Sequence, residues 1–284
     1  MLIGYEYRNK LHNPFRHFPV LHGKKAINFR TEHPEHLLVH VYSGKITVKT
    51  SDKTYVLSGG QSALLGRNQL AKFLKEPEGE IPFKAATLFL TQPFLQGYYK
   101  GLSLGRVRKS PQSGVLYLAN HSLLDDLFHS VSLYAGQDET FLQSELALLK
   151  VTEAITVLRV LSKDADLLLS DFSDPHKIDL AGFMRRNFIF NIPISRFAYL
   201  TGRSLATFKR DFQKVFGTSP QKWLTETRLR QAHFLIVEKR QRPSQAYIEV
   251  GFENFSHFSY AFRQFFGYTP SSINELVNTY NLSR

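Results

Sequence analysis

The sequence predicts an α+β fold: a β-rich N-terminal domain with accessory helices, then an all-helical C-terminal domain with two helix-turn-helix units. Three observations predict it. Short apolar stretches alternate with glycine turns between Glu35 and Leu90. The apolar spacing becomes helical over residues 123–160, and a phenylalanine pattern occurs twice in the last third of the chain, fifty residues apart. Short strands with regular turns are typical of small barrels or sandwiches, and a helical repeat indicates one supersecondary unit used twice.

Composition limits the class of protein. The 284 residues fit about two domains, and a hydrophobic fraction of 43% is enough for ordinary cores. The chain has no cysteine, which excludes disulfides, a thiol nucleophile and cysteine-ligated metal sites. No apolar run approaches the roughly 20 residues of a membrane span, and the N-terminus lacks the apolar stretch of a signal peptide. We therefore expect a soluble cytoplasmic protein with no membrane partner.

The net charge of +12 is unevenly distributed. Residues 176–284 contain 16 Lys and Arg against 7 Asp and Glu, whereas residues 1–175 contain 20 against 17. A basic domain attracts a polyanion and adds a salt-sensitive, sequence-independent part to its affinity. Basic charge alone would also fit an anionic membrane surface, but its coincidence with the repeat favours DNA.

The N-terminal domain is expected to be a small barrel or sandwich. Its predicted strands are residues 37–42, 45–49, 55–57, 61–65 and 84–90, separated by turns rich in Gly and Ser. Histidines are frequent near the start of the chain, at His12, His17, His22, His33, His36 and His40. A metal-binding barrel of this kind uses a His-x-His pair with downstream ligands, and the chain has no His-x-His. We expect no metal, no cofactor and no catalytic site.

Two amphipathic helices are predicted after the strands. The first has Leu123, Leu124, Leu127, Phe128 and Val131 on one face and ends near Gly136; the second has an apolar stripe through Phe141, Leu142, Leu146, Leu149, Ile155 and Leu158. A Ser- and Asp-rich segment that ends at Pro175 follows and is typical of a linker. The expected boundaries are 1–165 for the first domain (helices about 122–162), 166–176 for the linker and 177–284 for the second domain.

The repeat in the C-terminal domain is three phenylalanines at helical spacing, a glycine and a proline. Its two copies are Phe208, Phe212, Phe216, Gly217 and Pro220, and Phe258, Phe262, Phe266, Gly267 and Pro270. Phenylalanines four residues apart lie on one helical face, and the glycine ends the helix.

Each copy also has the start signals of a helix that follows a tight turn. Gly202 and Gly251 mark the turns, and Ser204 and Asn254 are good N-caps. The expected recognition helices are therefore Leu205–Phe216 and Phe255–Phe266, with Leu205 and Val215 on the apolar side of the first. A second helix of this kind fits the major groove of DNA.

This stretch resembles the DNA-binding domain of the AraC/XylS family of bacterial transcription regulators, over about 95 residues from Lys177 to about Leu276. The second copy matches the family's signature at Gly251, Phe252, Ser256, Phe258, Phe262, Arg263, Gly267, Thr269 and Pro270. The first copy and the connecting helix match at Ala198, Gly202, Ser204, Phe208, Arg210, Phe212, Gly217, Trp223, Leu224, Arg228, Leu229 and Ala232. The chain departs from the family at Tyr247, at Pro243-Ser244, and at Asp211, an acid at the edge of the outward face.

The resemblance implies a sequence-specific DNA-binding regulator that is not an enzyme, and we expect an activator. It implies RNA polymerase as a partner and makes the N-terminal strands similar to the cupin-like sensor barrels of such regulators. A small ligand is expected to act through that domain; a regulatory protein partner, or a cupin-type enzyme domain fused to a DNA-binding domain, is the alternative. The helices at 122–162 either pack on the barrel or supply a homodimer interface, or do both.

Candidate DNA contacts are the polar or small residues on the outward sides of the two helices and their caps: Ser204, Ala206, Lys209, Arg210, Gln213, Asn254, Ser256, His257, Tyr260 and Arg263. Arginine pairs well with the two acceptors of guanine, and amide, hydroxyl and lysine groups contact base edges or phosphates. Arg228, on the connecting helix, is expected to brace the domain instead.

Overall fold

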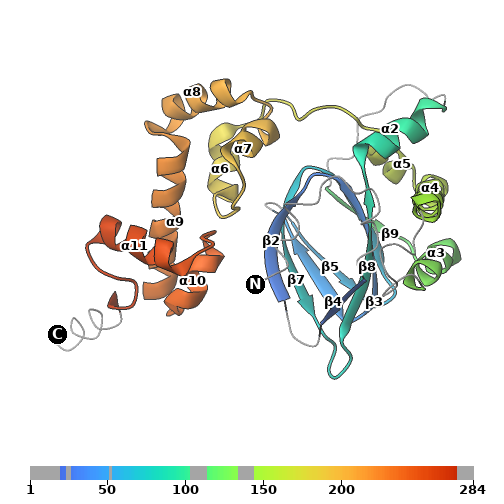
Figure 1. Ribbon diagram of the computed structural model, residues 1–284, viewed down its shortest axis with the longest axis horizontal. Helices are drawn as coiled ribbons and strands as arrows, with labels where there is room; N and C mark the ends of the chain where they lie inside the picture. Colours follow the sequence, from blue (N-terminus) through green and yellow to red (C-terminus); the bar gives the residue numbers. More distant parts are fainter. Residues whose placement is uncertain (1–19, 24–26, 51–52, 103–113, 134–143, 274–284) are drawn as a thin grey trace. The chain divides into compact units, whose positions relative to one another are not determined.

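The computed structural model describes residues 20–23, 27–50, 53–102, 114–133 and 144–273. The chain divides into two compact units, Met1–Ser173 and Asp174–Arg284 (Figure 1). The first contains the strands with accessory helices and the second is helical, so the predicted α+β class is confirmed. No helix in the described ranges is both long and apolar enough to cross a membrane.

The N-terminal unit is built from short strands followed by helices. The strands are β1 (Val20–Gly23), β2 (Ile27–His33), β3 (His36–Ser43), β4 (Lys45–Lys49), β5 (Thr54–Ser58), β6 (Ser62–Leu65), β7 (Gln69–Glu76), β8 (Phe83–Leu90) and β9 (Val115–Leu118). The helices are α2 (Gln92–Lys100), α3 (Ser122–Ser132), α4 (Ser144–Leu161) and α5 (Lys163–Leu169).

The strands form two antiparallel sheets, ordered β1-β8-β3-β6-β9 and β2-β7-β4-β5. Alternate residues of the two sheets meet in one core, which includes Val39 and Val41 of β3, Ile46 of β4 and Phe73 of β7. Within the described strands no backbone pairing joins the two sheets. The cupin-like domain is therefore sandwich-like rather than a closed barrel.

A tyrosine joins the two sheets at one edge. The hydroxyl of Tyr117 in β9 accepts a hydrogen bond from the backbone N–H of Val56 in β5 at 2.8 Å. The same hydroxyl donates to the backbone oxygen of Val56 at 3.1 Å. Because β5 and β9 are the last strands of their sheets, this side chain satisfies edge groups that backbone pairing leaves open.

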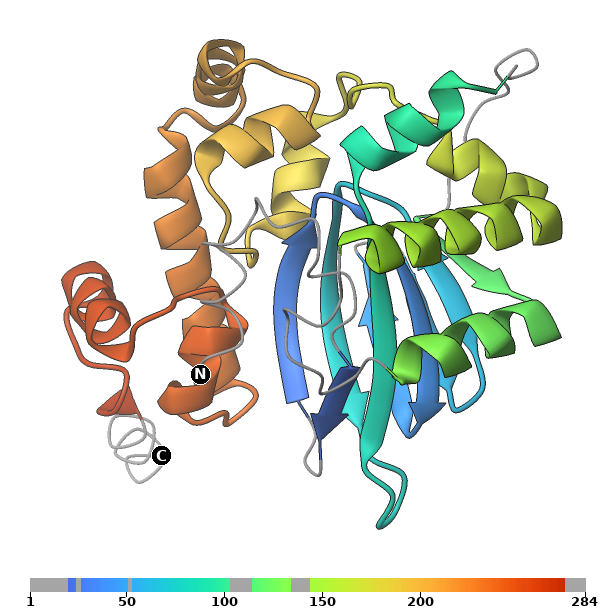
Figure 2. The ribbon, with the colours of Figure 1, turned by 45° about the vertical axis from the view of Figure 1, so that its right-hand side comes forward.

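Helices cover the other face of the five-stranded sheet (Figure 2). Leu38 of β3 and Leu88 of β8 pack there against Leu127 and Phe128 of α3. The buried side of α4 is formed by Ala147, Val151, Ala154, Ile155, Val157 and Leu158. The predicted stripe is not a single face: Ile155 and Leu158 are buried here, whereas Leu146 and Leu149 are exposed on the opposite side of α4. Phe141 and Leu142 lie outside the described residues.

Helix α5 occupies the start of the segment expected to be a linker. Its residues Ala165, Leu168 and Leu169 are buried in the same core as α4. Asp166, the first residue of the expected linker, accepts hydrogen bonds from Arg159 at 2.6 Å and from Tyr99 at 2.7 Å. The irregular stretch is accordingly residues 171–179. The polar residues Lys163 and Asp164 form the exposed side of this short docked helix.

Among the residues whose burial the structure describes, the N-terminal unit has three buried histidines, His33, His36 and His40. Burial lowers the pKa of His33 to about 4, and burial together with the nearby charge of Arg67 lowers the pKa of His36 to about 3. His40 stacks on Phe128, with ring centroids 4.7 Å apart, and bonds the Ser62 hydroxyl at 2.9 Å. Within the described residues, no three His, Cys, Asp or Glu side chains gather in an arrangement that could hold a metal ion.

The C-terminal unit contains α6 (Leu180–Asn187), α7 (Ile194–Leu200), α8 (Leu205–Phe216), α9 (Pro220–Val237), α10 (Pro243–Glu249) and α11 (Phe255–Phe266). It has two cores, one around Phe208 and Phe212 and one around Phe258 and Phe262. Helix α9 supplies Leu224 to the first core and Leu229, Ala232 and Ile236 to the second. A single helix thus connects two helix-turn-helix units in one body.

The two turn glycines are required by close backbone contacts. A Cβ on Gly202, at φ +66°, would lie 2.2 Å from the carbonyl carbon of His176, and one on Gly251, at φ +95°, would lie 2.3 Å from the carbonyl oxygen of Ile189. Only glycine fits such positions without moving the backbone. The turn at Gly202 is therefore packed against the segment before α6, and the turn at Gly251 against the segment before α7.

Arg228 braces the joint between the two helix-turn-helix units of the C-terminal unit. From α9 its Nε donates to the carbonyl of Phe188 at 2.7 Å and its terminal nitrogen donates to the carbonyl of Phe190 at 2.8 Å. Burial lowers the pKa of Arg228 to about 10, which leaves the guanidinium charged at neutral pH. The expectation that this arginine holds the domain together is confirmed.

Candidate nucleic-acid interface

Helix α8 separates its apolar and polar residues onto opposite sides. Phe208 and Phe212 are fully buried, and Phe216 packs on Trp223 with ring centroids 4.6 Å apart. The Ser204 side chain caps the helix by accepting from the N–H of Thr207, and Gly217 ends it in the left-handed conformation. This amphipathic arrangement fixes which side faces solvent.

The polar side of α8 presents Ala206, Lys209, Arg210 and Gln213, all exposed. Among the described residues neither Lys209 nor Arg210 has an ion pair or a side-chain hydrogen bond. Both cations are therefore available to an external anion or acceptor.

Asp211 does not oppose that surface with a free negative charge. Its carboxylate accepts from the Nε of Arg203 at 3.1 Å and lies 3.5 Å from the ammonium of Lys177. The hydrogen bond from Arg203, together with the charge of Lys177, lowers the pKa of Asp211. Arg203 in turn donates to the carbonyls of Ile178 and Thr201. Asp211, the acid that departs from the family pattern, therefore helps to hold the start of the C-terminal unit in place.

Helix α11 repeats the arrangement. Asn254 caps it by accepting from the N–H groups of Ser256 and His257, and Phe258 and Phe262 are buried. The exposed side presents Ser256, His257, Tyr260 and Arg263, with Tyr260 66% exposed. The Tyr260 ring and hydroxyl face solvent, where they can contact a base edge or sugar.

All ten predicted contact residues lie on the surface of these two helices or at their starts. Two of them have a structural task as well, since the side-chain oxygens of Ser204 and Asn254 are occupied as caps. Leu205 and Val215 lie on the phenylalanine side of α8, as helical spacing predicts. They are nevertheless 41% and 50% exposed, because they lie at the two ends of the helix.

A second group of cations was not predicted from the sequence. Lys239, Arg240 and Arg242 lie in the turn between α9 and α10, and all three are exposed. Residues 190–193, which occupy the corresponding place before α7, contain no cation. The sequence does contain a run of basic residues directly before Pro243, but this run does not form one face of a helix.

Comparisons with known proteins cover both units. A family model described as a helix-turn-helix domain matches residues 197–275, and one described as the ExsA N-terminal regulatory domain matches residues 36–169. The HTH-type transcriptional regulator ExsA of Pseudomonas aeruginosa is 29% identical over 238 residues, 80% of this chain and 82% of ExsA. The thermoregulatory protein LcrF of Yersinia pestis is 28% identical over 245 residues, 84% of this chain and 89% of LcrF.

A solved structure of ToxT from Vibrio cholerae covers 90% of this chain and 95% of its own, at 16% identity and a TM-score of 0.45. The family matches agree with the repeat, its caps and its turn glycines, and they confirm the resemblance seen in the sequence. The chain belongs to the AraC/XylS family of transcription regulators.

Proposed function

We propose that the chain activates transcription by binding specific DNA sequences through its C-terminal unit. The observation that carries the proposal is the pair of helices α8 and α11, each with a buried phenylalanine strip on one side and exposed polar side chains on the other. The major groove admits an α-helix and displays a distinct pattern for each base pair. The two helices would enter adjacent major-groove segments on one face of the duplex, about 34 Å apart.

In the first helix, Arg210 is the principal base-reading residue. An exposed guanidinium without an ion pair can donate two bonds to the O6 and N7 of guanine. Lys209 contacts a base or a phosphate, Gln213 contacts a base edge or a phosphate, and the methyl of Ala206 fits against a thymine methyl. Ser204 contributes chiefly by capping α8, which keeps the start of the helix in place.

In the second helix, Ser256, His257 and Tyr260 face the bases, and Arg263 lies nearer the phosphates. Asn254 uses its side-chain oxygen for the cap, which leaves its NH₂ group to donate to a phosphate. The turn with Lys239, Arg240 and Arg242 adds phosphate contacts beside α10, because the first helix of a helix-turn-helix crosses the DNA backbone.

The N-terminal unit controls this activity, with a small ligand as the first candidate signal and a protein partner as the second. A homodimer interface on the same unit, which is a separate proposal, has a specific observation in its favour. Helix α4 presents an outer row at 3-4-3-4 spacing: Leu146, Leu149, Glu153, Thr156 and Val160. Leu149 and Val160 are 62% and 73% exposed. Such spacing is that of a helix-pairing seam, which suits a second copy of the chain.

The dimer proposal is tested with a charge on that row. Leu149→Glu should shift the sedimentation of the purified protein from dimer to monomer. Leu148→Glu is the matched control, since Leu148 is also exposed but lies about 100° round the helix from the row. Equal dimer stability in both variants would rule out this face.

DNA recognition is tested by mapping the genomic sites that the protein occupies in cells and measuring its affinity for them. Specific sites should bind roughly 10³-fold or more tightly than scrambled DNA. A folded protein that does not discriminate them would overturn the proposal. In this role the chain recruits RNA polymerase in the cytoplasm and carries out no catalysis of its own.

A further inference from the structure

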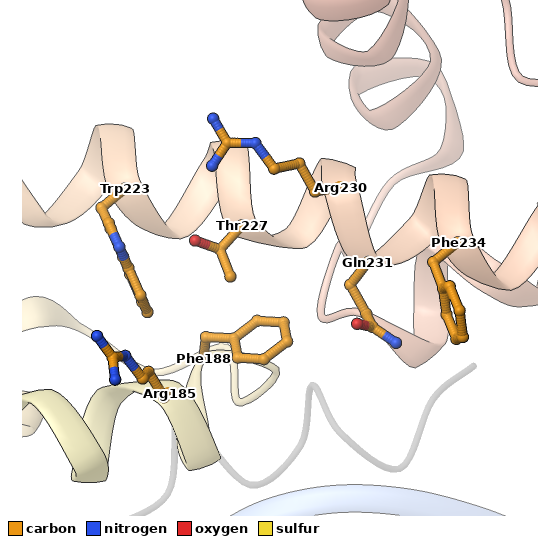
Figure 3. Close-up of a pocket in the computed structure, with 7 residues that line it drawn as sticks. All are labelled: Arg185, Phe188, Trp223, Thr227, Arg230, Gln231 and Phe234. Atoms are coloured by element: carbon orange, nitrogen blue, oxygen red, sulfur yellow. The ribbon is translucent and has the colours of Figure 1, made fainter.

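A pocket of about 430 Å³ lies within the C-terminal unit, between the end of α6 and one side of α9 (Figure 3). Its lining includes Phe188, which follows α6, and Trp223, Thr227, Gln231 and Phe234, which recur along α9 at helical spacing. Pockets that hold small organic ligands are typically about 300–1,000 Å³. None of the base-reading residues proposed above lines it.

The lining combines aromatic walls with free polar groups. Phe188, Trp223 and Phe234 supply three rings. Thr227 and Gln231 make no side-chain hydrogen bond to any of the described residues, so both can bond a ligand. Three of the seven lining residues are aromatic and four are polar or charged, which suits a ligand that has both an apolar body and polar groups.

Cations lie at both ends of the pocket. Arg185 of α6 is exposed and has no ion pair among the described residues. At the other end the ammonium of Lys239 lies 5.7 Å from the centre of the Phe234 ring. Arg230 is different: it pairs with Glu226 at 3.2 Å and points away from the rings in Figure 3. Arg185 is therefore the cation best placed to receive an anionic group.

We propose that this pocket is an effector site for a small organic anion with a flat apolar body, such as an aryl carboxylate. The apolar body packs on the aromatic rings that line the open groove, Arg185 pairs with the carboxylate, and Thr227 and Gln231 bond the remaining polar atoms.

The walls of the pocket connect to the DNA-binding parts. Trp223 packs on Phe212 and Phe216 of α8, with ring centroids 5.7 and 4.6 Å apart. The carbonyl of Phe188 is held by Arg228, which braces the joint between the two helix-turn-helix units. A ligand that moves Trp223 or Phe188 would therefore change how α8 and α11 are held. This consequence, unlike binding itself, rests on the proposed function.

The chain has a single tryptophan, Trp223, so its fluorescence reports this pocket directly. The full-length protein would be titrated with 4-phenylbutyrate and, as a neutral control, 4-phenylbutyramide. The carboxylate should change the emission saturably. Arg185→Gln should weaken its binding by about tenfold to a hundredfold, the value of a charge-assisted hydrogen bond. Arg186→Gln, an exposed neighbour that does not line the pocket, should bind like wild type.

Three results would overturn the proposal: no saturable change with the carboxylate, equal binding of the amide, or equal loss in the Arg185 and Arg186 variants. Far-ultraviolet circular dichroism of each variant identifies any that fails to fold, and Arg185→Lys, which keeps the charge, should restore part of the affinity. The fluorescence titration contains no DNA. Its result can therefore be interpreted even if the DNA-binding proposal fails. The effect of 4-phenylbutyrate on DNA affinity then measures the coupling.

Discussion

Among single residues, Arg210 gives the most specific prediction about which base the protein recognises. Its neighbour Asp211 is tied to Arg203, whereas Arg210 is exposed without an ion pair in the described structure. If Arg210 reads a guanine, Arg210→Ala should cost about 1–3 kcal/mol of binding and relax preference at one base position. Binding of both proteins to all single-base variants of one site, at two salt concentrations, measures this. A uniform loss with a smaller salt slope would assign Arg210 to phosphate.

The buried histidines make stability depend on pH. Because the pKa of His36 in the folded protein lies far below its ordinary value near 6.5, the unfolded chain binds more protons between these two values. Stability is therefore full above pH 6.5 and falls as the pH drops toward 3. At pH 5 the loss from His36 should be about 2 kcal/mol.

Urea unfolding of the full-length protein at pH 7.5 and pH 5 checks the effect. His36→Gln should remove that part of the pH dependence while keeping a side chain that can accept from the N–H of Arg67. His129→Gln, at an exposed position of α3, is the control and should behave like wild type. The same pH dependence in all three proteins would contradict the assignment.

At the scale of elements, the two recognition helices depend on their phenylalanine strips. Phe212 and Phe262 are fully buried, whereas Lys209 is exposed. Truncating a buried phenylalanine typically costs about 3–5 kcal/mol, because the ring no longer packs on its neighbours and a cavity remains. Phe212→Ala and Phe262→Ala should each lower the melting temperature of the C-terminal unit strongly, and Lys209→Ala should not. Equal melting temperatures would mean that the faces of the helices are reversed.

The turn before α10 should contribute charge without sequence preference. Replacing Lys239, Arg240 and Arg242 with Gln should weaken binding to all DNA sequences alike. The salt slope should fall by up to about one for each phosphate that these cations neutralise in the wild-type complex. A triple variant with an unchanged slope would place this turn away from the DNA. Lys222→Gln, exposed near the start of α9, is a single-site comparison.

Local sequence patterns predicted the elements whose start, end and buried face are marked by residues within the element or beside it. The caps Ser204 and Asn254, the glycine stops and the phenylalanine spacing gave α8 and α11 with their observed bounds. Strands β1, β2, β7 and β9 were missed, because their pairing partners lie far away in sequence: β1 pairs with β8, β2 with β7 and β9 with β6. The candidate DNA-binding surface followed from helical geometry. The basic run at Lys239 is visible in the sequence but lies on no helical face, and the pocket beside Trp223 depends on tertiary packing, which spacing does not encode.

At the scale of the whole molecule, the C-terminal unit should bind DNA without the N-terminal unit. It has its own two cores, and residues 174–284 contain 16 basic against 8 acidic residues, a net charge of +8. The fragment should begin at Asp174 rather than Lys177, because Asp174 accepts a hydrogen bond from the Tyr199 hydroxyl and the His176 backbone packs on Gly202.

Residues 174–284 should be folded by circular dichroism and bind promoter DNA with an affinity that falls steeply with salt. Residues 177–284 should melt at a lower temperature. A folded fragment without salt-dependent binding would show that the N-terminal unit is needed for DNA contact and not only for its control.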